Sequence, residues 1–265
     1  MLLRRGMNAL YSCGEIVLRV GHTTAAAHLA HDLVHVMERR GVPTVTPIAG
    51  LAGEFEGVSV TAWRRVVAVD ARIDWGAVGA AVRSVHDLSF TEVPIGYPVP
   101  SPSGFPWWDF EAVLGDVADV LDSAARRGLA AAIERNQGWQ HAIGAGRVVC
   151  HGDVHPGNVL MSPTGPLLID WDLLCAANPA WDHAMLSTYA ERWGGTPDVY
   201  PAFADGYGKN LADDELTASL AELRNVAATL LRVRAGVVDP VARDEAERRL
   251  RYWRGDREAP IWRAQ

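Results

Sequence analysis

The feature that most constrains the fold is a pair of short apolar runs joined by strong turn chemistry. Val159–Met161 and Leu167–Ile169 are the two runs, and the tripeptide Pro-Thr-Gly lies between them. Proline and glycine in such a place favour a tight turn, so we predict a β-hairpin centred on Thr164. Asn158 and Asp170 each lie six residues from that centre. An antiparallel pairing therefore sets these two residues side by side at the open end of the hairpin.

Asp153 lies on the loop that enters this end of the hairpin. With Asn158 and Asp170 it brings two carboxylates and a carboxamide to one place. These hard oxygen ligands suit Mg²⁺, which is usually held by few protein groups together with phosphates and water. His151 and His155 have the spacing of a zinc-binding helix, but a glycine and a proline directly after them disfavour a helix. The segment therefore predicts a magnesium site and not a zinc site.

The two ends of the chain differ in their predicted secondary structure. Strands are predicted at 15–20 and 58–63 with a helix at 25–40, and the Gly- and Pro-rich segment 43–57 has room for a further short strand. Beyond Pro179, helical spacing predicts helices at 181–192, 199–207, 213–235 and 240–254. We expect an α+β fold, with a small antiparallel-sheet N-terminal lobe at residues 1–66 and a larger, mostly helical C-terminal lobe at residues 67–265.

The middle of the chain begins with a helix and a long loop. Asp74 can cap a helix that runs to about His86, and residues 88–108 hold five prolines and the adjacent pair Trp107 and Trp108. Long ordered loops are often functional. Further helices are predicted at 109–126 and 129–143, followed by a strand at 147–150.

Composition narrows the class of protein. The 265 residues are 49% apolar and 22% charged, as in ordinary globular proteins. No apolar run reaches the roughly 18 residues of a membrane span, and the first residues lack a signal-peptide pattern. The three cysteines are too few and too scattered for a disulfide framework, which favours the cytoplasm. A net charge of −7 argues against a nucleic-acid partner.

The sequence HGDVHPGN at 151–158, followed by IDWD at 169–172, resembles the active-site signature of the aminoglycoside phosphotransferase and choline kinase-like family. That family shares the protein-kinase architecture, so the resemblance implies a two-lobed, protein-kinase-like fold. Asp153 and Asn158 have the spacing of the kinase catalytic loop, and Asp170 falls at the kinase metal-binding aspartate. The resemblance covers nearly the whole chain and is most specific in this segment.

The resemblance implies a role for each residue of the signature. Asp153 is expected to orient the attacking hydroxyl and accept its proton. Asn158 and Asp170 are expected to hold Mg²⁺ that bridges the nucleotide phosphates. His151 and His155 are expected mainly to brace the loop, and either can lie near the substrate.

Further residues follow from the same resemblance. Asp172 stands at an often acidic position and is expected to reach a second metal or the phosphates. Asp182 matches a later acidic position that braces the catalytic loop. Trp171, Trp107 and Trp108 are candidates to line the acceptor site, which is expected between the catalytic loop and the C-terminal helices.

The resemblance is looser in the N-terminal lobe. Arg19 stands in the place of the phosphate-binding lysine, and its guanidinium can fork onto phosphate oxygens without being equivalent to an ammonium. Val17, on the same strand face, is expected to lie against the nucleotide base. Thr61, Ala62 and Trp63 are expected to form the hinge that binds the base through backbone groups.

Two kinase features are missing from this lobe. The helix at 25–40 has no glutamate where the family's lysine finds its ion-pair partner, and Asp32 is the nearest acid. No Gly-rich loop precedes the first predicted strand, and the chain begins almost directly at that strand. The loop that covers the phosphates is then expected to be short, around Gly6–Ala9. Met7 is a neighbouring candidate start site.

The resemblance implies transfer of the γ-phosphoryl group of ATP or GTP to a hydroxyl of a small molecule. An antibiotic is the favoured acceptor, with resistance by phosphorylation as the outcome. A metabolic kinase with a choline-, homoserine- or sugar-like acceptor is the alternative. A non-catalytic nucleotide-binding protein is a third reading, favoured by the two missing features and by arginine in place of the lysine. The intact Asp153, Asn158 and Asp170 argue against this third reading. A monomer or a homodimer, without membrane partners, is expected.

Overall fold

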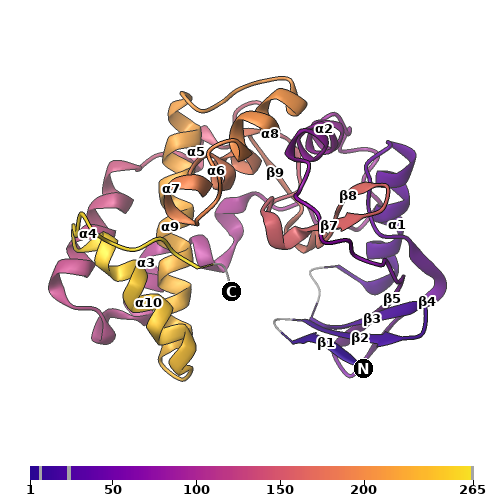
Figure 1. The fold of residues 1–265 in the computed structure, drawn as a ribbon, viewed down its shortest axis with the longest axis horizontal. Coiled ribbons are helices and arrows are strands. Elements are labelled where there is room, and N and C mark those ends of the chain that lie inside the picture. The colour runs from indigo at the N-terminus through magenta and orange to yellow at the C-terminus, as the bar shows by residue number, and fades with distance from the viewer. Residues whose placement is uncertain (6–7, 23–24, 264–265) are drawn as a thin grey trace. The chain divides into compact units, whose positions relative to one another are not determined.

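A computed structural model describes residues 1–5, 8–22 and 25–263, which form two compact units (Figure 1). Unit 1 combines Met1–Val99, Val148–Ala176 and Ala202–Asn210. Unit 2 combines Pro100–Arg147, Ala177–Pro201 and Leu211–Gln265. Strands gather in unit 1 and helices in unit 2, which confirms the α+β class, and the division into lobes after residue 66 stays a prediction.

Unit 1 contains a five-stranded antiparallel sheet in the order β1-β2-β3-β5-β4. Its strands are β1 (Leu2–Arg5), β2 (Asn8–Cys13), β3 (Ile16–Gly21), β4 (Pro47–Phe55) and β5 (Val58–Arg64). The predicted strands at 15–20 and 58–63 are confirmed as β3 and β5. The further strand expected within 43–57 is β4, which runs for nine residues.

The expectation that the chain begins almost directly at the strand at 15–20 is wrong, because β1 and β2 precede it. Both strands lack a clear alternation of apolar and polar residues, and Leu2, Leu3 and Arg4 of β1 are exposed. The sequence pattern therefore did not indicate these strands. Of the loop expected around Gly6–Ala9, Asn8 and Ala9 belong to β2. Gly6 and Met7 lie outside the described residues.

Helix α1 (Ala27–Arg39) confirms the predicted helix and packs against β4 and β5. Its buried side includes His31, whose ring meets Trp63 of β5 edge-on at 5.0 Å between centroids. Glu54 of β4 accepts a hydrogen bond from the Ala27 N–H at 3.3 Å and so satisfies one free donor at the helix start. The acids of α1 lie on its exposed side.

Helix α2 (Trp75–His86) begins at the predicted cap, because the Asp74 carboxylate accepts from the Ala77 N–H at 3.0 Å. It packs against β6 (Val148–Cys150), which pairs with β9 (Cys175–Ala177). Helix α8 (Val199–Tyr207) crosses α2 closely. A Cβ on Gly79 would lie 2.0 Å from the Phe203 carbonyl, so the crossing requires glycine there.

Strands β7 (Val159–Ser162) and β8 (Gly165–Leu168) form the predicted hairpin, but its register differs by one residue. Ser162 pairs with Gly165, so the turn contains two residues and is not centred on Thr164. The Ser162 hydroxyl explains the shift. It donates to the Gly165 carbonyl at 2.8 Å and bonds the Thr164 hydroxyl at 3.0 Å, which closes a tighter turn.

The register shift corrects the expected partner of Asn158. Its carbonyl accepts from the Ile169 N–H at 3.1 Å, so Ile169 and not Asp170 lies opposite. Asp170 then leaves the hairpin with a left-handed backbone, at φ 67°.

Unit 2 is built from helices around aromatic side chains. The helices are α3 (Phe110–Asp116), α4 (Ser123–Arg135), α5 (Trp139–Ala142), α6 (Ala180–Ser187), α7 (Tyr189–Arg192), α9 (Glu215–Gly236) and α10 (Pro240–Trp253). Short 3₁₀ turns occupy 102–104, 106–108 and 118–120 here, and 156–158 and 171–173 in unit 1. The helices predicted at 199–207, 213–235 and 240–254 are confirmed.

Three other helix predictions are wrong in their bounds. The stretch 109–143 divides into α3, α4 and α5, because the Asp122 carboxylate caps a new helix at Ala124 and Ala125, both at 3.0 Å, and Gly138 takes φ 90°. The helix expected at 181–192 divides at Thr188 into α6 and α7. Local caps therefore end these helices at positions where the helical spacing of apolar residues continues.

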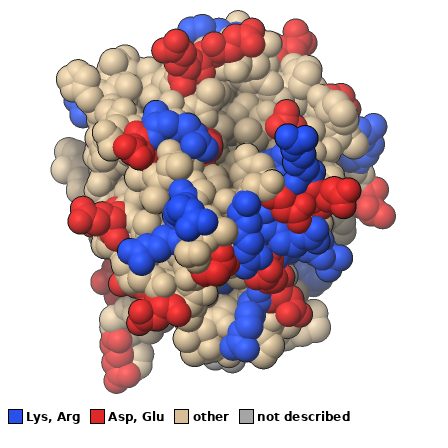
Figure 2. Space-filling view, turned by 90° about the vertical axis from the view of Figure 1, so that its left-hand side faces the viewer, with Lys and Arg blue, Asp and Glu red and all other residues tan. Residues whose placement is uncertain are grey.

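The surface of the molecule carries both signs of charge. On the face drawn in Figure 2, basic and acidic side chains lie interspersed. In unit 2, Arg254 pairs with Asp122 at 2.8 Å and with Glu247 at 2.5 Å, joining α4 to α10. Among the described residues, none of the helices combines the length and the apolar character that a membrane crossing requires.

Candidate active site

The loop that follows β6 is shaped by a buried histidine and a glycine. His151 is fully buried; its Nδ1 accepts from the Asp153 N–H at 3.3 Å, and its Nε2 lies 3.2 Å from the Ile169 carbonyl. These partners require the neutral tautomer with hydrogen on Nε2. Gly152 has φ 93°, and a Cβ there would meet the Leu173 carbonyl at 1.9 Å. The loop therefore lies close against the segment that follows β8, and His151 contacts both of them.

Asn158 holds Asp153 through both hydrogens of its side-chain amide. Nδ2 donates to the Asp153 carbonyl at 2.9 Å and to Asp153 Oδ2 at 3.1 Å. Because both amide hydrogens are used, the side-chain orientation is determined, and Oδ1 is the end that remains. Oδ1 makes no hydrogen bond to any of the described residues, although Asn158 is only 6% exposed.

His155 makes a second contact with the same carboxylate. Its Nδ1 accepts from the Gly157 N–H at 3.1 Å, and its Nε2 lies 3.3 Å from Asp153 Oδ2. The imidazole therefore carries its hydrogen on Nε2, the nitrogen that faces the Asp153 carboxylate. This contact goes beyond bracing the loop, because it orients the carboxylate itself.

Asp170 is an acid whose pKa is raised by its surroundings. Burial raises the pKa of Asp170, and the neighbouring Asp172 carboxylate raises it further, whereas Arg19 and His151 oppose the change. The left-handed backbone is uncommon for a residue other than glycine, and the side chain remains 42% exposed. Asp170 thus presents a carboxylate in a region dense with acids.

Arg19 on β3 reaches across to these acids. Its Nη2 lies 3.4 Å from Asp170 Oδ1 and forms a very short ion pair with Asp172 Oδ2. The Arg19 side chain is 13% exposed and that of Asp172 is 22% exposed. The structure therefore brings Arg19, Asp170 and Asp172 together, over a separation of about 150 residues that sequence spacing does not reveal.

The other expected nucleotide-binding residues lie in the same sheet. Arg19 pairs with Thr61 and Val17 with Trp63, so these four side chains share one face. Trp63 Nε1 donates to the Thr61 hydroxyl at 2.9 Å. Ala62 faces the opposite side and is buried. Because β5 lies between β3 and β4, its backbone pairs on both sides. Thr61 is 1% exposed and Trp63 packs on His31, so the hinge role expected for Thr61, Ala62 and Trp63 stays a prediction.

Trp171 serves as a scaffold for the loop. It is 7% exposed, and its ring packs on His151 at 4.6 Å between centroids. Its indole N–H donates to the Thr44 hydroxyl at 3.2 Å, and its carbonyl accepts from the Tyr97 hydroxyl at 3.0 Å. Thr44 and Tyr97 were not anticipated, since each lies in an irregular segment without a motif.

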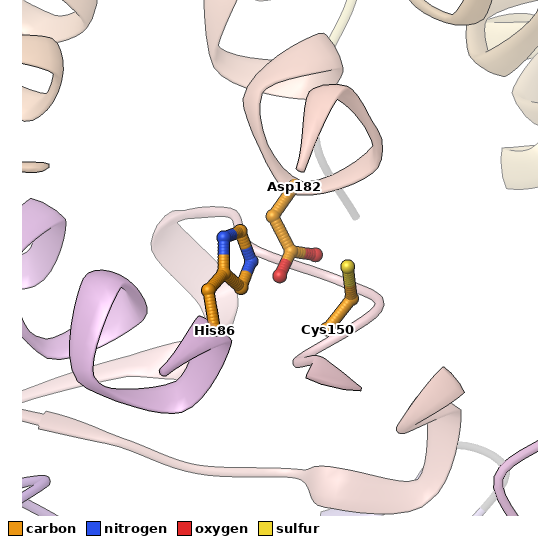
Figure 3. Close-up of side chains that lie close together, drawn as sticks. All are labelled: His86, Cys150 and Asp182. Carbon is orange, nitrogen blue, oxygen red and sulfur yellow. The ribbon is translucent and has the colours of Figure 1, made fainter. Parts of the chain in front are cut away.

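Two buried side chains, one from α2 and one from β6, lie close together. His86 of α2 and Cys150 of β6 face each other, with ligand-type atoms within 4.8 Å (Figure 3). His86 Nδ1 also bonds the Tyr207 hydroxyl at 2.9 Å. Asp182, drawn with them, is a buried residue of unit 2.

Trp107 and Trp108 also belong to unit 2. Trp108 is 5% exposed and packs on Trp181 and Trp139, at 4.5 and 4.9 Å between centroids. Trp107 stacks on Phe105 at 5.0 Å. Trp108 is therefore part of the aromatic core, whereas Trp107 lies nearer the surface.

The donor set suits Mg²⁺. The uncommitted Oδ1 of Asn158 and the partly exposed Asp170 carboxylate are hard oxygen ligands, as this ion prefers. Both nitrogens of His151 and both of His155 are already engaged within the loop, so they do not compete as ligands.

Solved structures with similar folds are phosphotransferases. The spectinomycin phosphotransferase APH(9)-Ia in complex with ADP and spectinomycin has a TM-score of 0.72 and 16% identity, over 95% of this chain and 88% of that one. The APH(2")-IIIa complex with GDP and kanamycin scores 0.65 at 15% identity, over 97% and 93%. A choline/ethanolamine kinase family protein from Mesorhizobium loti scores 0.64 at 17% identity, over 98% and 88%.

Sequence comparison agrees with the fold. None of the curated proteins matches the chain significantly. The profile of the phosphotransferase enzyme family, however, matches residues 10–223, most of the chain. The predicted protein-kinase-like fold class and the predicted family are confirmed. The chain belongs to the phosphotransferase enzyme family and is a phosphotransferase with an alcohol group as acceptor.

Proposed function

We propose that this protein transfers the γ-phosphoryl group of ATP or GTP to a hydroxyl of a small molecule, and that Asp153 is its catalytic base. The observation that carries this proposal is the fixed orientation of one carboxylate. Asn158 donates to Asp153 Oδ2, and His155 Nε2 lies 3.3 Å from the same oxygen. Arg19, held by Asp170 and Asp172, supplies a positive charge for a phosphate.

Asp153 would act on the acceptor hydroxyl. Its carboxylate orients the hydroxyl and takes the proton while the acceptor oxygen forms a bond to the γ-phosphorus and the bond to the bridging oxygen of the nucleoside diphosphate breaks. Positioning supplies much of the rate in such reactions. A carboxylate held by two side chains loses little freedom when substrate binds, which fits this role.

Asn158 and Asp170 would hold Mg²⁺ through Asn158 Oδ1 and the Asp170 carboxylate. The ion, when bound, neutralises charge on the phosphate oxygens. Arg19 would bind a phosphate from the sheet side, where its guanidinium is mostly buried. The resulting proposal makes residues 1–66 the nucleotide-binding lobe, with Val17 on the sheet face turned to the base.

The proposed acceptor is a hydroxylated antibiotic. Structures of similar fold include phosphotransferases crystallised with spectinomycin and with kanamycin, which supports this class. A choline/ethanolamine kinase family protein has a comparable score, so a metabolic alcohol is the second candidate acceptor.

Mass spectrometry tests the proposal. Purified protein is incubated with Mg²⁺, with ATP or GTP, and with a panel of hydroxylated antibiotics and metabolites. One panel member should gain the mass of a phosphoryl group with the wild-type protein and not with Asp153→Asn. A complete absence of transfer, together with no binding of either nucleotide, would contradict the proposal and favour a non-catalytic protein.

A further inference from the structure

Arg19 has an unusual partner for a phosphate-binding cation in a kinase-like fold. In protein kinases the corresponding lysine pairs with a glutamate of the helix that covers the sheet. Here that helix is α1, whose acids Asp32 and Glu38 lie on its exposed side. The titratable residue that α1 turns to the sheet is His31, which is 7% exposed.

The partner comes instead from the segment after β8. Asp172 Oδ2 accepts a very short hydrogen bond from Arg19 Nη2, and Asp170 Oδ1 lies 3.4 Å from the same nitrogen. A charge that is 13% exposed needs such a partner, because an unpaired buried charge is costly. Asp172, on a loop, therefore supplies the carboxylate partner that a helix glutamate supplies in protein kinases.

The geometry of the contact leaves most of the guanidinium available. Both ion pairs use Nη2, and among the described residues Nη1 and Nε of Arg19 make no hydrogen bond or ion pair. A guanidinium has five N–H donors in a rigid fork, so one nitrogen can be anchored while the others bind an anion. A lysine carries its three donors on a single nitrogen, so its anchor and its phosphate contacts cannot lie on separate nitrogens.

We propose that Asp172 is a positioning residue that anchors Arg19 through Nη2, so that Nη1 and Nε are presented to a phosphate of the nucleotide. This inference rests on the proposed function and specifies which acid serves the phosphate clamp. The anchor removes rotamer freedom from a long side chain before the ligand arrives, which lowers the entropic cost of binding. The clamp then depends on the loop after β8 and not on the position of α1.

Equilibrium binding without metal tests the anchor directly. The dissociation constant of a fluorescent ADP analogue is measured in EDTA for the wild type, Asp172→Asn, Arg19→Lys and the double variant. Each single change should weaken binding by about fivefold to tenfold, since each loosens or shortens one charge-assisted contact. The double variant should be no weaker than the weaker single variant, because residues that act through one contact are not additive.

Two further variants sharpen the test. Asp172→Glu keeps a carboxylate and should recover part of the lost affinity. Asp32→Asn removes the nearest acid of α1 and should bind like the wild type. Thermal melting of every variant separates loss of binding from loss of fold, and Asp172→Glu with Arg19→Lys remain informative if Asp172→Asn does not fold.

The contrary outcomes are distinct. Unchanged or tighter binding by Asp172→Asn, or single effects that multiply in the double variant, would overturn the anchor and indicate an independent role for Asp172. Weaker binding by Asp32→Asn would indicate that the acid partner of Arg19 comes from α1. A wild-type protein that binds no nucleotide would overturn the proposed function and this inference together, whereas the first outcomes leave the proposed function intact.

Discussion

Asn158 donates both hydrogens of its side-chain amide to Asp153, one to the main-chain carbonyl at 2.9 Å and one to Oδ2 at 3.1 Å. The pair lies at the base of the hairpin β7–β8, so the loop and the hairpin are joined at the proposed catalytic carboxylate.

Asn158→Asp keeps a side-chain oxygen but loses both donors and sets a second negative charge beside Asp153. We expect kcat to fall by about a hundredfold or more, because the carboxylate loses its orientation and gains a repulsive neighbour. Steady-state kinetics on a variant with unchanged melting measures this, and a kcat within threefold of wild type, roughly, would show that the contact is dispensable.

Removal of the proposed base gives the second prediction. Asp153→Ala should lower kcat by on the order of a hundredfold or more, since general-base catalysis typically contributes that much. The KM for nucleotide should change little, because Asp153 is assigned to the acceptor. Near-full activity in a folded Asp153→Ala protein would remove Asp153 from its role.

His155 should affect turnover more than binding. His155→Phe removes the Nε2–H donor that lies 3.3 Å from Asp153 Oδ2. Loss of one hydrogen bond to a charged group corresponds to about a tenfold decrease in kcat, with the KM for nucleotide unchanged. His141→Phe, a change at an exposed position of α5, is the matched control. A rise in KM without a fall in kcat would place His155 in substrate binding instead.

Gly152 should be among the least replaceable residues of the loop. Gly152→Ala puts a Cβ 1.9 Å from the Leu173 carbonyl in a backbone with φ 93°. We expect a loss of about 3 kcal/mol or more in the free energy of unfolding, measured by denaturant titration. Gly104→Ala, where nothing lies within 4 Å, should change it by less than about 0.5 kcal/mol. Equal effects of the two changes would contradict the close approach.

Stability should depend on pH through His31. Burial lowers the pKa of the His31 imidazole, His35 lowers it further and Asp32 opposes them. Below the unfolded value of about 6.5 the unfolded chain therefore binds more protons at this site than the folded chain. The free energy of unfolding should fall as the pH drops below that value and show no contribution from His31 above it. Urea titrations at several pH values give the free energy of unfolding as a function of pH. This free energy should depend less steeply on pH in His31→Leu than in the wild type, and an equal dependence would assign the effect to other groups.

The candidate site was largely predictable because its central residues lie in one short segment. A loop and a hairpin bring together Asp153, Asn158 and Asp170, and the residues that form such turns can be recognised in the sequence. The exact register was not, because the Ser162 hydroxyl closes the turn one residue tighter than symmetry about Thr164 suggests.

Contacts between distant segments could not be predicted. The pair of Arg19 and Asp172 joins residues 153 apart, and no periodicity encodes it. The hydroxyls of Thr44 and Tyr97 support Trp171 from two irregular segments. The break within 109–143 depends on the single cap at Asp122, which an apolar spacing does not reveal.

The most direct measurement of the central claim is phosphoryl transfer from γ-labelled ATP or GTP to the acceptor, compared between the wild type and Asp153→Asn. Nucleotide affinity of both proteins is measured in parallel. The account predicts labelled acceptor with the wild type, about a hundredfold less with Asp153→Asn, and equal nucleotide affinity. Equal transfer by both proteins would contradict it, because the reaction would then proceed without the carboxylate that Asn158 and His155 hold in place.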